Sequence, residues 1–199
     1  MRRASEQADL FLATTPLPSG LRYQSEFLAA DCERALVAQC AGLPFKAFEF
    51  RGFQGKRRVV SFGWRYDFNG GGLQKADDMP AFLLRVRDKA AAFAQIAAAN
   101  LQQALVTEYR PGAAIGWHKD RSVFGDVIGL SLRSACMFRL RRRIDTNWQR
   151  ASLTVEPRSI YVLRGASRSQ WEHSIPPVST LRYSVTFRSL LPAAGLPAP

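Results

Sequence analysis

Apolar and polar residues alternate along much of the second half of the chain, and this two-residue period predicts strands. Six segments with this pattern, separated by Gly, Pro, Asp or Asn, cover residues 104–109, 127–132, 136–140, 153–155, 160–163 and 181–187. Two further strands are predicted at 21–27 and 45–50. This number of short strands in about ninety residues indicates a β-sandwich or a jelly roll.

A helical period precedes these six strands. Two aspartates, a methionine and a proline at 77–80 are typical of a helix start. Apolar side chains then recur at spacings of four, four, three and four, at Phe82, Val86, Ala90, Phe93 and Ala97. They predict an amphipathic helix of about five turns, and a shorter helix is predicted at 31–40. The predicted fold class is therefore α+β, a β-sandwich or jelly roll with supporting N-terminal helices.

Chain length and composition predict one domain over residues 21–191. Residues 1–20 are expected to be a flexible lead-in and 192–199 a disordered tail. There is no run of about 18 apolar residues, and Glu6 and Asp9 interrupt any signal-peptide pattern, so no membrane span and a cytoplasmic location are predicted. The three cysteines form no closely spaced pair and are expected to be reduced. We expect a monomer.

The charge of the chain favours a polyanionic partner such as nucleic acid. The formal net charge is +12, and residues 133–188 hold eleven arginines. The alternative for any single arginine is a solubilising surface. Residues 52–72 interleave cations with aromatic rings and end in three glycines, a combination that suits unstacked bases and a movable lid. These rings could equally belong to the core.

The candidate chemistry begins at His118 and Asp120, two residues apart after a turn signal. His173 is the only other histidine of the sequence. Two imidazoles and one carboxylate are the protein ligands of mononuclear non-haem iron sites, which leave positions open for a keto acid and dioxygen. The alternative for each histidine is a hydrogen-bonded core residue.

The last predicted strand carries a second pattern. Arg182, Ser184, Thr186 and Arg188 occupy alternate positions and share one face. Two arginines at this spacing could hold a short dicarboxylate between them. A polar face that meets water, as is common in antiparallel sheets, is the alternative.

Four motifs together, Tyr109-x-Pro111-Gly112, His118-x-Asp120, His173 and Arg182-x5-Arg188, resemble the AlkB family of iron(II)- and 2-oxoglutarate-dependent dioxygenases. The resemblance spans roughly residues 100–190. The sequence Phe62-Gly63-Trp64-Arg65-Tyr66 is similar to the family's nucleotide-recognition lid, which corresponds to residues 52–72 here. The resemblance implies a double-stranded β-helix, the jelly roll of these enzymes.

The resemblance also implies roles for individual residues. His118, Asp120 and His173 would bind Fe(II), and Arg182 and Tyr109 would bind the distal carboxylate of 2-oxoglutarate. Arg188 would lie near the metal-bound end of this cosubstrate, and O2 is the second cosubstrate. Two residues stand where family members often have asparagine and are expected to donate hydrogen bonds to 2-oxoglutarate: Thr107 and Ser184. Four others are expected to contact the substrate: Trp64, Tyr66, Arg168 and Trp171.

The function implied is oxidative demethylation of alkylated nucleobases in DNA or RNA, with release of formaldehyde, succinate and CO2. Ser122 stands where the repair enzyme has an acidic residue that contacts the damaged base. Two alternatives remain. One is the same chemistry on a protein side chain or a small molecule, and the other is a non-catalytic module that binds nucleic acid.

Overall fold

The computed structural model describes residues 16–50 and 52–191. Most of the predicted lead-in, residues 1–15, and the predicted tail at 192–199 lie outside the described residues. The helices are α1 Ala30–Ala41, α2 Ala81–Ala94, the 3-10 turn η1 Ala98–Asn100 and α3 Ala166–Ser169. Among the described residues, no helix has both the length and the apolar character needed to cross a membrane.

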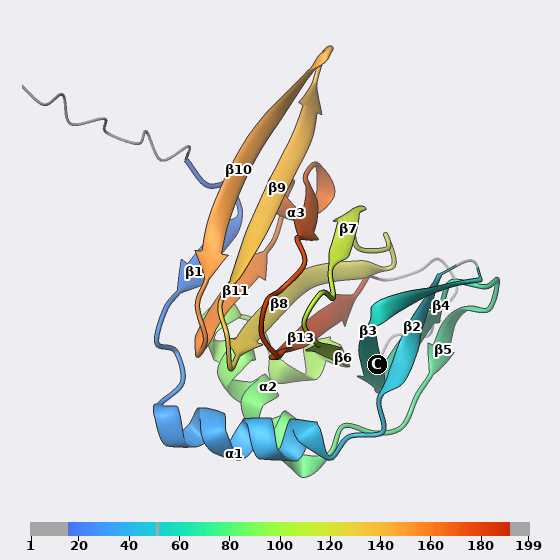
Figure 1. The fold of residues 1–199 in the computed structure, drawn as a ribbon, viewed down its shortest axis with the longest axis vertical. Coiled ribbons are helices and arrows are strands. Elements are labelled where there is room, and N and C mark those ends of the chain that lie inside the picture. The colour runs from blue at the N-terminus through green and yellow to red at the C-terminus, as the bar shows by residue number, and fades with distance from the viewer. Residues whose placement is uncertain (1–15, 51, 192–199) are drawn as a thin grey trace, which may run out of the picture.

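Strands dominate the structure, and two sheets face each other (Figure 1). The larger sheet has the order β1-β11-β8-β13-β6-β3-β2, and the smaller one has the order β10-β9-β12-β7. The strands of the larger sheet are β1 Leu21–Gln24, β2 Lys46–Phe50, β3 Phe53–Phe62, β6 Leu101–Tyr109, β8 Phe124–Leu132, β11 Ser159–Leu163 and β13 Arg182–Leu190. Those of the smaller sheet are β7 Ile115–His118, β9 Cys136–Ile144, β10 Asn147–Val155 and β12 Glu172–Ile175. This is the predicted jelly roll with helices beside it.

The core has two parts because the larger sheet is covered on both faces. On one face, α1 and α2 pack against residues such as Val106, Leu130 and Val185. On the other face, the smaller sheet packs through Phe138 and Leu140. Fully buried aliphatic and aromatic side chains are worth about 1.5–3 kcal/mol each, so the two layers hold the sheets at a fixed separation.

The structure corrects the predicted face of α2. The residues of this helix that are fully buried are Leu83, Ala90, Ala91 and Ala94, while Phe82, Val86 and Phe93 are only partly buried. The helix also ends at Ala94, before Ala97, because Gln95 adopts a left-handed conformation. The small alanines are buried because the helix lies close to the sheet. The spacing of apolar residues in the sequence does not show how close a helix lies to a sheet.

The predicted lid segment at 52–72 consists largely of strands. It contains β3 and β4 Trp64–Asp67, and the latter pairs with β5 Gly72–Lys75 in a separate two-stranded sheet. Gly63 separates β3 from β4 with a φ of +71°, and a Cβ there would collide with the carbonyl oxygen of Gln102. Glycine is therefore required at this bend, which directs β4 away from the larger sheet.

Candidate metal centre

Two adjacent strands of the smaller sheet position the candidate metal ligands. His118 ends β7, His173 lies on β12, and the two are directly paired in the antiparallel register. Asp120 follows β7 by two residues, so its carboxylate reaches the same point. One ligand atom from each of the three side chains lies within 4.8 Å of the others. The sequence placed these residues 55 positions apart, and strand pairing brings them together.

Hydrogen bonding leaves one ring nitrogen of His118 available for a metal. Its Nδ1 lies 2.9 Å from the carbonyl oxygen of Gly116, to which a protonated Nδ1 donates. Metal-binding histidines usually have such a partner on the second nitrogen, which fixes the tautomer and the ring orientation. His173 is fixed by packing, since its ring centroid lies 5.2 Å from that of Phe138.

Asp120 is held by an arginine from the opposite sheet. Nε and Nη2 of Arg188 lie 2.8 and 2.7 Å from Oδ1 of Asp120, and Nη1 of Arg188 donates to Gln103 at 2.9 Å. The other oxygen, Oδ2, is 3.7 Å from Nε2 of His173 and has no hydrogen-bond partner among the described residues. A buried carboxylate oxygen without a partner is costly unless something binds it. Its position among two imidazoles fits a cation.

The electrostatics of the three side chains favour the forms that bind metals. Burial raises the pKa of Asp120, but Arg188 and the two histidines outweigh burial and hold that pKa well below its usual range. Burial, with repulsion from His118, lowers the pKa of His173 to about 3. Burial also lowers the pKa of His118. A carboxylate and two neutral imidazoles are therefore present at neutral pH, as metal coordination requires.

A second group of residues surrounds Arg182, which is predicted to bind the cosubstrate. Arg182 is 1% exposed, and its Nε donates to the hydroxyl of Ser131 at 3.2 Å. Its Nη1 is buried and has no partner among the described residues. The guanidinium lies 5.0 Å from the ring centroid of Tyr109, the residue paired with it across β13 and β6. The next inward-facing pair on these strands is Ser184 with Thr107, and both are buried. A buried guanidinium with one nitrogen that lacks a partner fits a carboxylate.

The profile of the 2OG-Fe(II) oxygenase superfamily matches residues 48–188, more than half of the chain. The matched region includes the triad and the arginine site. This chain belongs to the 2OG-Fe(II) oxygenase superfamily. It is a dioxygenase whose cofactor is Fe(II) and whose cosubstrates are 2-oxoglutarate and O2. The alternative of a non-catalytic binding module is thereby set aside.

Two known proteins are similar in sequence to this oxygenase. An "Alkylated DNA repair protein ALKBH8 homolog" from Arabidopsis thaliana is 28% identical over 145 residues, which are 61% of this chain and 42% of that protein. An uncharacterized protein, L905, from Acanthamoeba polyphaga mimivirus is 29% identical over 102 residues, 45% of this chain and 48% of that protein. The chain spans less than half the length of either curated relative.

Solved structures agree on the fold of this oxygenase. OsALKBH1 superposes with a TM-score of 0.67 at 17% identity, covering 88% of this chain and 99% of that one. A Pseudomonas putida prolyl-4-hydroxylase gives 0.58 at 19% identity, covering 87% and 94%. The family motifs and the first relative confirm the predicted resemblance to AlkB proteins. At these identities, the structural matches bear on the fold.

The residues predicted to contact substrate occupy different environments in this oxygenase. The hydroxyl of Tyr66 on β4 accepts a hydrogen bond from Arg121 at 2.7 Å, so this lid residue reaches the chain next to Asp120. Trp64 lies on the same strand and packs under Lys75. Arg168 donates to the carbonyl oxygens of three residues that lead into and begin β8: Arg121, Phe124 and Gly125. Arg168 therefore holds the loop that follows Asp120 in place.

Trp171 is 3% exposed and packs in the core between the two sheets, with the guanidinium of Arg142 5.1 Å from its ring centroid. Its contact with the substrate stays a prediction. Trp171 directly precedes β12, the strand that carries His173. Whether a tryptophan at this point is buried depends on how that strand packs against the core. The sequence did not specify that packing.

Sequence reasoning missed Arg57 of β3. Its guanidinium lies 3.6 Å from the ring centroid of Phe48 and has no hydrogen-bond or carboxylate partner among the described residues. Burial lowers its pKa, while Tyr109 raises it, and the charge of Arg57 lowers the pKa of His118. A half-buried cation that lacks a carboxylate partner is able to meet an anion or a carbonyl group of a ligand. In the sequence, Arg57 was one of several cations in a basic segment, and nothing in the pattern distinguished it.

Proposed function

We propose that this dioxygenase removes methyl groups from alkylated nucleobases in nucleic acid. His118, Asp120 and His173 would hold Fe(II), and a site with two imidazoles and one carboxylate leaves positions for a keto acid and dioxygen. The single observation that carries the iron assignment is the unpartnered Oδ2 of Asp120, placed between two neutral imidazoles.

Arg182 binds the distal carboxylate of 2-oxoglutarate with its free Nη1 and with help from the hydroxyl of Tyr109. Ser184 and Thr107 form the next pair on the same face of β13 and β6, and their hydroxyl groups hydrogen-bond to the cosubstrate. Ser131 keeps the guanidinium in place through its Nε. Arg188 orients Asp120. The family resemblance implies a different role for Arg188, near the cosubstrate. Both roles are compatible because the guanidinium of Arg188 has three donor nitrogens.

Iron(II) with bound 2-oxoglutarate and dioxygen supplies the oxidising equivalents that hydroxylate a methyl group, while the keto acid becomes succinate and CO2. A hydroxymethyl group on nitrogen then leaves as formaldehyde. The protein holds the methyl group near the metal and excludes water from it. The strands of the predicted lid segment at 52–72 position the methylated base. One of their residues, Tyr66, accepts a hydrogen bond from Arg121, which directly follows the metal ligand Asp120.

Support for a nucleobase substrate comes from the side chains around Tyr66 and Arg121, which we call the entrance of the site. Three aromatic rings there have centroids 5.0–5.6 Å from the ring centroid of Phe68: Phe48, Phe50 and Tyr66. Cations lie over two of these rings, Arg57 over Phe48 and Arg121 over Tyr66. Rings that offer a stacking surface and cations that offer charge are what an unstacked nucleotide needs. The name of the Arabidopsis relative also refers to alkylated DNA repair.

The test is aerobic turnover with Fe(II) and 2-oxoglutarate on single-stranded oligonucleotides that carry 1-methyladenine or 3-methylcytosine. Mass spectrometry follows the loss of one methyl group, and succinate is assayed in parallel. We expect demethylation by the wild-type protein and none by His118→Ala. Succinate without demethylation would keep the iron site and replace the substrate with a protein side chain or a small molecule. Absence of both products in protein shown to contain iron would contradict the proposal.

A further inference from the structure

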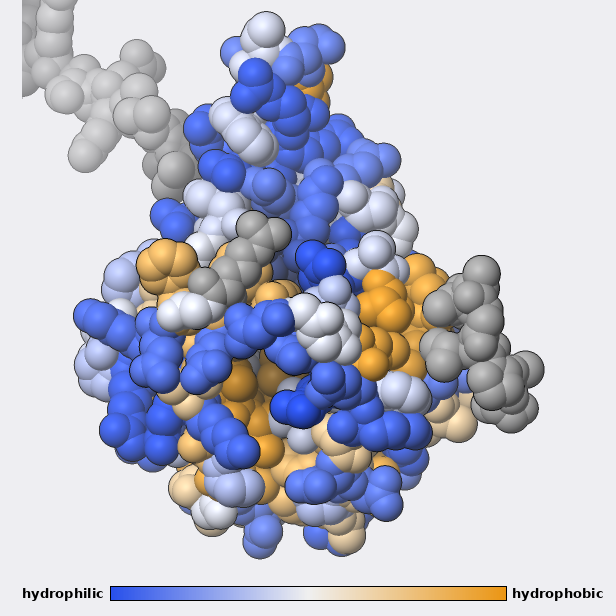
Figure 2. Space-filling view, turned by 90° about the vertical axis from the view of Figure 1, so that its right-hand side faces the viewer, coloured by the Kyte–Doolittle hydropathy of each residue, from blue (hydrophilic) through white to orange (hydrophobic). Residues whose placement is uncertain are grey.

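The hairpin formed by β9 and β10 extends well beyond the rest of the jelly roll (Figure 1). From residue 139 to residue 150 it carries five arginines and a single acid, Asp145. In the space-filling view, this projecting part of the molecule is covered almost entirely by hydrophilic residues (Figure 2). We use the name hairpin face for the residues on its outward side: Arg139, Arg141, Arg143, Trp148 and Arg150.

Like charges face each other on this surface. Arg150 is paired directly with Arg141 across the two strands, and Arg143 is paired with Trp148. Like charges opposite each other in an antiparallel pair destabilise a sheet. Glu172 on the neighbouring strand forms an ion pair with Arg141 at 2.7 Å, whereas Arg150 forms no ion pair with a residue in the part of the chain described. The hairpin therefore keeps an uncompensated positive charge that its own folding does not require.

Indole rings hold these cations in place. The guanidinium of Arg141 lies 4.4 Å from the ring centroid of Trp117 and 4.1 Å from that of Trp148. Arg139 lies over Trp117 at 5.1 Å, and Arg143 lies over Trp148 at 5.6 Å. Arginines stacked in this way lose less side-chain freedom when they bind a ligand, and their planar forks match phosphate oxygens. The hairpin face is thus ordered before any partner arrives.

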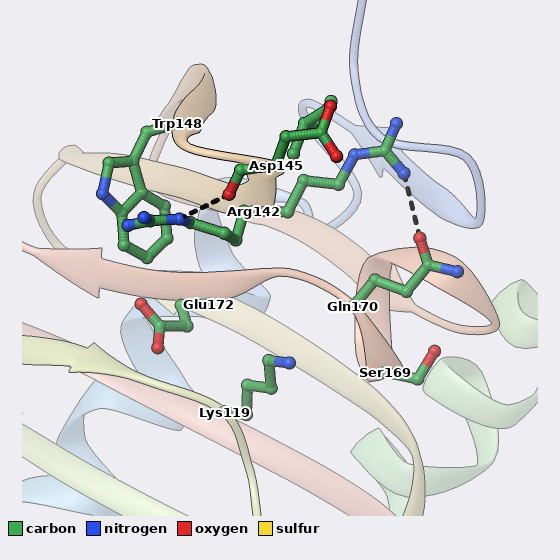
Figure 3. Close-up of a pocket in the computed structure, with 9 residues that line it drawn as sticks. Lys119, Arg142, Asp145, Trp148, Ser169, Gln170 and Glu172 are labelled. Atoms are coloured by element: carbon green, nitrogen blue, oxygen red, sulfur yellow. Dashed lines mark hydrogen bonds between the residues drawn. The ribbon is translucent and has the colours of Figure 1, made fainter.

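This face is the reverse side of the strands that carry the metal ligands. Trp117 directly precedes His118, and Glu172 directly precedes His173. Between the hairpin end and these strands lies an open cavity of about 700 Å³, lined by Lys119, Arg142, Arg143, Trp148 and Glu172 among others (Figure 3). Lys119 enters this cavity from the position between two metal ligands, His118 and Asp120. A ligand in the cavity would therefore lie next to the metal centre but outside it.

We propose that the hairpin face and this cavity bind the sugar–phosphate backbone of nucleic acid beside the target nucleotide. The inference rests on the proposed function and names the surface that holds the rest of the substrate. Charge complementarity selects this partner, because the hairpin and Lys119 carry six positive charges against two negative ones, Asp145 and Glu172. The exposed arginines contact phosphates. Lys119 extends this row of positive charges toward Arg121 and the entrance.

The experiment measures binding of an unmethylated single-stranded oligonucleotide by fluorescence anisotropy at several salt concentrations. The variant Arg143→Gln/Arg150→Gln removes two exposed arginines of the hairpin face. The matched control is Arg85→Gln/Lys89→Gln, which removes the same charge from exposed positions on α2, at the opposite end of the molecule (Figure 1). We expect the hairpin variant to bind about tenfold more weakly and its salt slope to fall by about 1.4, the value for two lost phosphate contacts on a single strand.

We expect the control to bind like the wild type, and Arg143→Lys/Arg150→Lys to restore most of the binding and the slope. Wild-type binding by the hairpin variant would overturn the inference. So would equal weakening in the hairpin and control variants, because net charge alone would then explain it. A polyglutamate peptide that competes as well as the oligonucleotide at equal charge would show that the surface takes acidic protein, which also overturns it.

A second readout separates this inference from the proposed function. Binding of an unmethylated strand does not depend on iron or on turnover. If the wild-type protein fails to demethylate any oligonucleotide and the hairpin variant still loses binding, the proposed reaction is wrong and the nucleic-acid surface stands. If the wild-type protein demethylates and the hairpin variant has an unchanged KM for the oligonucleotide, the surface is wrong and the reaction stands.

Discussion

Arg188 directs two of its nitrogens to one oxygen of Asp120, at 2.8 and 2.7 Å, and leaves the other oxygen facing His173. The two residues come from opposite sheets, so this contact joins the sheets at the metal centre. A carboxylate oriented in this way presents a single oxygen to the metal. The arginine is therefore expected to affect metal affinity as well as folding.

Replacement of Arg188 by methionine should weaken metal binding by about 10- to 100-fold, the usual cost of losing a residue that orients a ligand. Titration with Mn(II) measures this without turnover. Arg164→Met is the control, because Arg164 forms a comparable ion pair with Asp126 at 2.6 Å and contacts no candidate ligand. Equal metal affinity in Arg188→Met and the wild type would show that Asp120 needs no orientation.

Replacement of Arg182 by methionine should raise the KM for 2-oxoglutarate by about 10- to 100-fold, since hydrogen bonds to charged groups contribute about 1.5–3 kcal/mol. The lysine variant should recover only part of this loss, because it cannot reproduce the fork that meets Ser131 and the carboxylate. Steady-state succinate formation at varied 2-oxoglutarate provides the measurement. An unchanged KM would place the cosubstrate elsewhere.

Replacement of Arg57 by methionine should raise the KM for the nucleic-acid substrate and leave the KM for 2-oxoglutarate unchanged. Methionine keeps an apolar side chain against Phe48 but removes the only guanidinium stacked on this ring among the described residues. The two KM values are measured on the same preparation. If the KM for 2-oxoglutarate rises instead, Arg57 belongs to the cosubstrate site.

Metal binding should stabilise the fold, because the three ligands join β7, β12 and the loop that follows β7. At a Mn(II) concentration about 100 times the Kd, the melting temperature should rise by about 5–10 °C. A chelator should reverse the shift. His118→Ala should melt at the same temperature with and without metal, and a metal-dependent shift in that variant would point to another site.

Stability at acid pH should depend on Glu108. Arg58 hydrogen-bonds to this carboxylate at 2.7 Å and outweighs burial, and Arg110 adds to the effect, so the pKa of Glu108 is lowered from 4.5. A lowered folded-state pKa means that the ion pairs stabilise the protein fully above pH of about 4.5 and lose this contribution as pH falls below it. Glu108→Gln should therefore unfold at a temperature that changes less between pH 6 and pH 4, as thermal melts would show. An identical pH dependence in both proteins would exclude the effect.

Several features of the site follow from short-range sequence patterns. The spacing of His118 and Asp120, the alternation around Arg182 and the family motifs together predicted the metal and arginine sites and the jelly roll. Alternation decides which face a strand residue occupies, because successive side chains point to opposite sides. Residues 136–140 and 153–155 were predicted as two short strands, yet residues 136–155 form one long hairpin. Strand pairing extends β9 and β10 over polar residues, which do not show the alternation of apolar and polar positions.

Tertiary structure alone decided the partners of these residues. The sequence determined that Arg188 shares a face with Arg182, but the register of β13 and the path of the chain after β7 decided that it contacts Asp120. In the same way, Trp171 is buried and Arg57 stacks on Phe48 because of where their chain segments lie in the fold. Strand register and sheet stacking depend on contacts between residues far apart in the chain. Local patterns therefore specify the residue types and faces of the site, and long-range packing specifies which side chains meet.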